Sequence, residues 1–85
     1  MPWNYRVCYR PSCEVPSYYI HEVYYDDKGR IKYYSSSPIT PFGDDADELY
    51  EDMALMWKAF DKEVLDLDRL DRKFEIQAHS RDHDD

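Results

Sequence analysis

Residues 43–60 read GDDADELYEDMALMWKAF, and this stretch predicts the main helix of the chain. Asp45, or alternatively Asp44, is suited to cap the helix, and Glu48 follows Asp45 at the spacing of a capping box. Beyond the cap, apolar residues recur every three or four positions, as on the buried face of an amphipathic helix. These residues are Ala46, Leu49, Met53, Met56, Trp57 and Phe60. We therefore expect this stripe, including Trp57, to form the core.

Three stretches before this helix have the composition of β-strands. Residues 3–10 alternate between large apolar and polar side chains, whereas residues 18–25 and 30–35 are rich in tyrosine and β-branched types. Between the last two, residues 26–29 form a predicted hairpin turn in which Gly29 supplies a positive φ. The chain is thus expected to be an α+β protein, with a three-stranded antiparallel β-meander packed on one main α-helix.

The sequence after the main helix carries weaker signals. Leucines and aspartates alternate over residues 64–71, which predicts a docked extended piece followed by a short helical turn. Polar residues dominate the chain end. We expect a single domain over residues 1–76 and a flexible polar tail over residues 77–85.

The negative charge of the chain is concentrated in one segment. The 85 residues carry 19 acids and 11 Lys or Arg, a formal net charge of -8, and residues 44–71 hold eleven of those acids against three bases. Direct binding to duplex DNA is disfavoured, because phosphate contacts need clustered Lys and Arg. A charged block of this kind is either a solvated face or a docking surface for a basic partner.

Several features place the chain in a broad class. No apolar run approaches the roughly 20 residues that span a bilayer, and the first residues lack the layout of a secretory signal. Two cysteines, Cys8 and Cys13, are too few for a disulfide scaffold. We expect a cytoplasmic protein with no membrane contact and with both thiols reduced.

No set of residues predicts catalysis, a metal site or a cofactor. His79 and His83 lie among aspartates in the predicted tail, where nothing would preorganise them as metal ligands. A pairing of Cys8 with His21 would lack an oxyanion hole. Two glycines are too few for a phosphate-binding loop. We expect a protein without enzymatic activity.

The tyrosines allow two interpretations. Eight of the nine lie in residues 5–34, within the predicted strands. A sheet of aromatic side chains is typical of single-stranded RNA-binding platforms, and tyrosine is equally enriched at the centres of protein interfaces. Tyr24 and Tyr34 are therefore candidate contact residues.

The order of strand, strand, hairpin, strand and then Gly43 to Leu49 opening a long helix resembles HicB-like antitoxin domains, over roughly residues 3–60. The resemblance implies a β-β-β-α core, a partial ribonuclease-H-like fold, and a protein that neutralises a basic RNase toxin by masking it. Two features differ from the family. The usual Pro-Gly-Cys stretch between strands two and three is absent, and residues 61–85 leave no room for the separate DNA-binding part.

Charge and resemblance together predict an acidic, non-enzymatic module that binds and inhibits a basic nucleic-acid-handling protein, such as a toxin RNase or a nuclease complex. A phage-encoded anti-defence inhibitor (anti-CRISPR or anti-restriction) and a small single-stranded RNA-binding protein are the alternatives. Whether the chain forms a homodimer stays open. The candidate partner-binding residues are Asp44, Asp47, Glu48, Glu51, Asp52, Leu55, Tyr24 and Tyr34.

Overall fold

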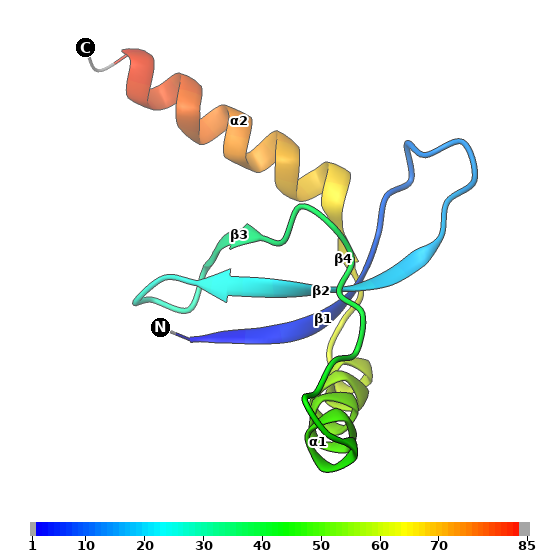
Figure 1. Cartoon of the computed structure of the whole chain (residues 1–85). Helices are drawn as coiled ribbons and strands as arrows, with labels where there is room; N and C mark the ends of the chain where they lie inside the picture. Colours follow the sequence, from blue (N-terminus) through cyan, green and yellow to red (C-terminus); the bar gives the residue numbers. More distant parts are fainter. Residues whose placement is uncertain (1, 84–85) are drawn as a thin grey trace.

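The computed structural model describes residues 2–83, with side chains as far as Glu75, and shows an α+β protein (Figure 1). One four-stranded sheet has the strand order β3-β2-β1-β4. The elements are β1 (Trp3–Tyr9), β2 (Tyr18–Tyr25), β3 (Ile31–Tyr34), α1 (Ala46–Trp57), the 3₁₀ helix η1 (Lys58–Asp61), β4 (Leu65–Asp66) and α2 (Leu67–His83). None of the helices in this part of the chain is long and apolar enough to cross a membrane.

The predicted antiparallel meander is confirmed, but it is not the whole sheet. β1 pairs with β2 and β2 with β3, both antiparallel. In the hairpin between β2 and β3, the Asp26 carboxylate accepts hydrogen bonds from the backbone N–H groups of Lys28 and Arg30, and Gly29 has φ +80°. The two-residue strand β4 then pairs in parallel with β1. This fourth strand was predicted only as a docked extended piece, because two residues are too few to show a period.

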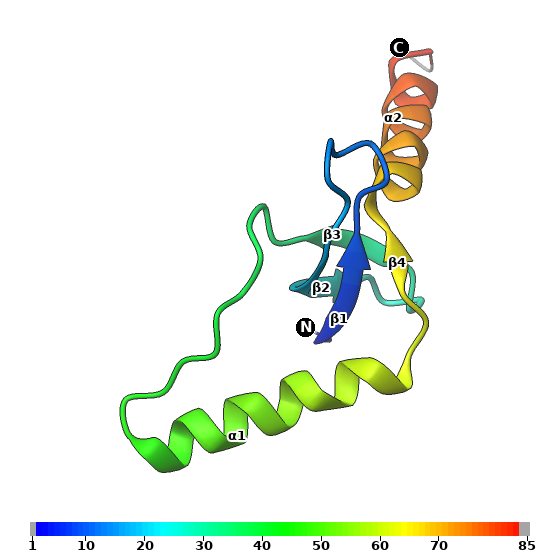
Figure 2. The same cartoon turned by 90° about the vertical axis from the view of Figure 1, so that its right-hand side faces the viewer.

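The prediction that the apolar stripe of α1 forms the core is wrong. Asp45 caps the helix as expected, its side chain accepting from the N–H of Glu48. Of the stripe, however, only Met56 is buried, whereas Met53, Phe60 and Trp57 are 54%, 62% and 75% exposed. Figure 2 shows that most of α1 lies away from the sheet. The helix meets the sheet at its C-terminal end, where Met56 and Ala59 pack on Tyr5 and Val7.

The core is divided between the two sides of the sheet. Alternate residues of β1 point to opposite faces, so Tyr5 and Val7 pack toward α1 while Cys8 packs toward α2 with Val23 and Leu67. α1 and α2 lie on opposite sides of the strands (Figures 1 and 2). Seven hydrophobic residues in the described part of the chain are buried, so each of the two clusters is small.

The second helix is longer than predicted. α2 extends from Leu67 to His83, where the sequence predicted a short helical turn and then a polar tail from residue 77. Asp84 and Asp85, the end of that tail, lie outside the described residues. The helix begins directly after β4, and the Asp66 carboxylate accepts from the N–H of Arg69. Asp66 is therefore the side-chain cap of α2. The alternation of leucines and aspartates in residues 64–71 made this cap hard to recognise from the sequence.

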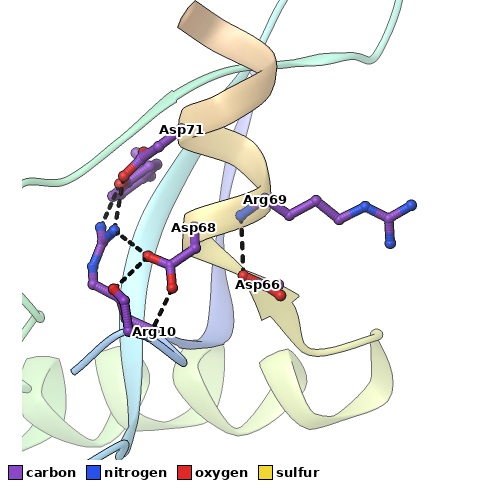
Figure 3. A network of polar contacts seen from close by, with 7 residues as sticks. Arg10, Asp66, Asp68, Arg69 and Asp71 are labelled. Carbon is purple, nitrogen blue, oxygen red and sulfur yellow. Dashed lines mark hydrogen bonds and ion pairs between the residues drawn. The ribbon is translucent and has the colours of Figure 1, made fainter. Parts of the chain in front are cut away.

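One arginine joins α2 to the sheet (Figure 3). Arg10, at the end of β1, donates to carboxylate oxygens of Asp68 and Asp71 at 2.9 and 2.8 Å, and to the hydroxyl of Tyr34 at 2.8 Å. Asp68 also accepts from the N–H and hydroxyl of Ser12. The network therefore connects the start of α2 to two strands and to the loop that follows β1.

Partial burial alone would raise the pKa of Asp68, but hydrogen bonds from Ser12 and Arg10 outweigh it and lower the pKa below its ordinary value. A carboxyl whose pKa is lower in the folded state stabilises the fold above its unfolded pKa of about 4, and this contribution is lost as the pH falls. We expect Asp68→Asn to lower the urea midpoint at pH 7 and to differ little from wild type at pH 3. An equal difference at both pH values would contradict the pairing.

The two cysteines should differ sharply in reactivity. Cys8 is fully buried, and burial raises the pKa of its thiol to about 11, whereas Cys13 is exposed. Because the thiolate is the reactive form, we expect a disulfide reagent at pH 8 to label one thiol per chain rapidly and the second only in denaturant. Cys13→Ser should remove the rapid phase. Rapid labelling of that variant would show that Cys8 is accessible.

Candidate functional site

A groove of about 460 Å³ opens between α1, the chain segment 39–43 and the sheet. We call it the acidic groove. Five carboxylates line it: Glu22, Asp44, Glu48, Glu51 and Asp52. Its apolar lining comes from Tyr5, Ile39, Phe42 and Leu55. Within the residues whose side chains are described, none of these carboxylates forms an ion pair.

Asp52 joins the parts of the chain that form the acidic groove. Its carboxylate accepts from the hydroxyl of Tyr5 at 2.5 Å and from the backbone N–H of Phe42 at 2.9 Å. One side chain of α1 thereby contacts both β1 and the segment leading into the helix. Burial, together with the hydrogen bond to Asp52, raises the pKa of Tyr5, so the hydroxyl stays protonated and donating at neutral pH.

Gly43 lets the chain turn closely into α1. A Cβ atom at this position would lie 2.2 Å from the backbone nitrogen of Leu49, which no side chain tolerates. Any substitution at this position would push segment 39–43 away from the helix. The glycine that the sequence marked as a helix start therefore also sets the width of the acidic groove.

The acidic groove brings together most of the predicted partner-binding residues. Asp44, Glu48, Glu51, Asp52 and Leu55 all line it, and Leu55 is 47% exposed. Asp47 is exposed on α1 but lies outside the groove lining.

The two predicted tyrosines have different surroundings. Tyr24 lies beside the groove, with its hydroxyl donating to Glu22 at 2.9 Å. Tyr34 faces the other side of the sheet and donates to Asp71 at 2.6 Å, so it belongs to the Arg10 network.

Sequence reasoning did not include the other residues that line the groove among the candidate contact residues, and these are Tyr5, Glu22, Ile39, Thr40, Phe42 and Gly43. Glu22 lies directly opposite Tyr5 in the register of β1 and β2, so the two share one face of the sheet. Alternation along β2 places Glu22 on the same face as Ile20 and Tyr24. Which face of β2 points inward was ambiguous, however, because both carry aromatic residues.

A row of aromatic side chains crosses the sheet next to the acidic groove. Tyr24 stacks on Tyr33 with ring centroids 4.6 Å apart, and Trp3 lies 6.4 Å from Tyr24. Lys58 and Lys62 line a neighbouring cavity together with Trp3. This arrangement has the elements of a stacking platform with nearby cations.

The structure does not join Cys8 and His21 as a nucleophile and base. The Cys8 thiol donates to the carbonyl of Arg6 at 3.5 Å, and the His21 Nδ1 lies 2.9 Å from the carbonyl oxygen of Ser35. In the part of the chain with described side chains, no group of three or more His, Cys, Asp or Glu is placed to hold a metal ion. The side chains of His79, His83 and their aspartate neighbours lie outside that part.

The Tyr5 hydroxyl is expected to contribute to stability through Asp52. Tyr5→Phe removes a part-buried hydrogen bond to a carboxylate, and we expect a loss of about 1–2 kcal/mol in the free energy of unfolding. Tyr33→Phe is the matched control, because the Tyr33 ring is 48% exposed and surface changes of this kind cost less than about 0.5 kcal/mol. Equal urea midpoints for the two variants would contradict a structural role for the bond.

Comparison of the chain with protein-family models, with curated proteins and with solved structures finds no match. The resemblance to HicB-like antitoxin domains stays a prediction from residues 3–60.

Proposed function

We propose that the chain is a non-catalytic module that binds a basic segment of a nucleic-acid-handling protein in the acidic groove and thereby masks it. One observation carries the proposal: five carboxylates from β2, α1 and the segment between them surround an apolar lining. A solvated acidic helix would need no such lining. The charge of residues 44–71 supports a partner of opposite charge.

The groove has the chemistry to receive arginine or lysine side chains. Their aliphatic stems would pack on Phe42 and Leu55, while the charged ends reach Asp44, Glu48 and Glu51 at the rim. Asp52 already accepts two hydrogen bonds, so its charge adds to the field of the groove more than to direct contact. Occupying the cations that a basic protein presents to phosphates would block its nucleic-acid binding.

An antitoxin and a phage-encoded inhibitor of a host nuclease would use this surface in the same way. Both are cytoplasmic, in keeping with two free cysteines. Neighbouring genes separate them, since an antitoxin lies beside a small basic toxin and an inhibitor lies in an anti-defence cluster. The HicB-like arrangement of residues 3–60 favours the antitoxin.

The aromatic row favours a second candidate, which is binding of single-stranded RNA. Tyr24, Tyr33 and Trp3 would stack bases, and Lys58 and Lys62 would contact phosphates. Glu22 and the rest of the acidic groove lie alongside this row and oppose a polyanion. The charge distribution therefore favours the basic protein partner.

A displacement assay tests the masking of a basic segment. A nona-arginine peptide is loaded with a fluorescein-labelled single-stranded RNA, and release of the RNA is followed by anisotropy as the protein is added. We expect Glu48→Gln/Glu51→Gln to need roughly tenfold more protein than wild type, because two groove carboxylates are lost. Asp47→Asn/Glu63→Gln removes the same charge outside the groove and should need less than about twofold more. Rising salt should weaken the effect.

The possible outcomes separate the candidates. Equal losses for the two double variants would show that bulk charge, not the groove, attracts the peptide. Direct binding of the labelled RNA to the protein alone, abolished by Tyr33→Ala, would support the second candidate.

A further inference from the structure

The apolar stripe of α1 faces a second groove, of about 430 Å³, on the side of the helix toward the start of β2. Val7, Ile20, Ile39 and Met56 form its inner part, and Tyr18, Met53, Trp57 and Phe60 are exposed along it. We call this surface the apolar face. None of the residues that line it carries a charge.

An amphipathic helix normally buries the stripe that α1 leaves open. Trp57 is 75% exposed and its ring lies 5.4 Å from that of Phe60, itself 62% exposed. Tyr18, across the groove, is 65% exposed and stacks on Tyr9. Large apolar patches of this kind on a soluble protein mark a surface that another molecule covers.

The exposed side chains of the apolar face supply enough area for a small dimer interface. Tyr18, Trp57 and Phe60 are 65%, 75% and 62% exposed, and an aromatic side chain buries roughly 150–250 Å² when it is covered. Together with Met53, which is 54% exposed, they offer several hundred Å², comparable with the roughly 800 Å² that each partner buries in a standard interface.

The distribution of charge favours a second copy of the chain as the molecule that covers the apolar face. A basic partner would gain nothing from a lining without carboxylates, and that partner has the acidic groove on the other side of segment 39–43. Two copies of a chain with net charge -8 repel each other, so a self-contact has to lie where the surface carries no charge. The apolar face meets that condition.

We propose that the apolar face is the interface of a symmetric homodimer. Around a two-fold axis each copy presents the same surface, so Trp57 and Phe60 of one copy would cover the groove between α1 and β2 of the other. The dimer would extend the small core cluster that contains Val7 and Met56, because both residues also line the apolar face. The interface leaves the acidic groove open, and this inference goes beyond the proposed function without depending on it.

Sedimentation velocity of the full chain over about 1–100 μM tests the dimer. We expect wild type to sediment at twice the 10.3 kDa chain mass, with dissociation only at the lowest concentrations. Trp57→Ser should raise the dimer dissociation constant about thirtyfold or more, as for the central aromatic residue of an interface. Phe42→Ser is the matched control, since Phe42 is 71% exposed but lines the acidic groove; it should leave the dimer unchanged and weaken peptide displacement.

Salt provides a measurement that needs no variant. Because screening reduces the repulsion between two acidic chains, raising NaCl from about 50 to 500 mM should tighten the dimer, while it weakens binding of a basic peptide. A wild-type chain that stays at 10.3 kDa at every concentration and salt level would overturn the proposal. So would equal weakening of the dimer by Trp57→Ser and Phe42→Ser. Neither result would affect the test of the acidic groove.

Discussion

The hydrogen bond from the Tyr5 hydroxyl to the Asp52 carboxylate determines which side of α1 meets the sheet. Asp52, Met56 and Ala59 lie along one side of the helix and its 3₁₀ extension, and all three face inward. Rotating the helix to bury Trp57 and Met53 would break this bond and move a carboxylate away from its two donors. The buried Tyr5 hydroxyl would then lack its acceptor, and an unpaired buried donor costs about 1–3 kcal/mol, so this polar contact opposes burial of the rest of the apolar stripe.

On the opposite side of the sheet, Arg10 plays the corresponding role for α2. Its guanidinium joins Asp68, Asp71 and Tyr34, which belong to the helix and to the edge strand β3. The side chains of Arg10, Asp68 and Asp71 are 33%, 23% and 40% exposed, so solvent screens the pairs in part. These ion pairs mainly fix the direction of α2, because a helix that follows a two-residue strand has few other contacts that could do so.

The placement of α1 gives the chain two surfaces of different chemistry on the two sides of segment 39–43. The acidic groove collects carboxylates from three parts of the chain, and the apolar face collects side chains without charge. Ile39 lines both, so the segment between β3 and α1 is the boundary between them. A basic ligand and a second copy of the chain would therefore not compete for one site.

The local elements follow from the sequence alone because their signals are short-range. Alternation identified β1, the Asp26–Gly29 turn identified the hairpin, and Asp45 with Glu48 identified the start of α1. The acidic character of α1 was also readable, since it follows from the composition of residues 44–52. The strand β4 was not predicted as a strand because two residues show no period. The length of α2 was not predicted because the leucines and aspartates of residues 64–71 alternate, which conceals the start of the helix.

Only the tertiary structure decided which face of α1 is inside. An apolar stripe predicts burial, but it does not say whether enough sheet surface lies opposite to cover it. Here Tyr5 takes Asp52 as its partner, and the single strand face that remains accommodates Met56 and Ala59 alone. Glu22 joined the acidic groove for the same reason, through a cross-strand register that no local pattern encodes. Trp57 is exposed because contacts between distant parts of the chain, rather than its own hydrophobicity, set the rotation of the helix.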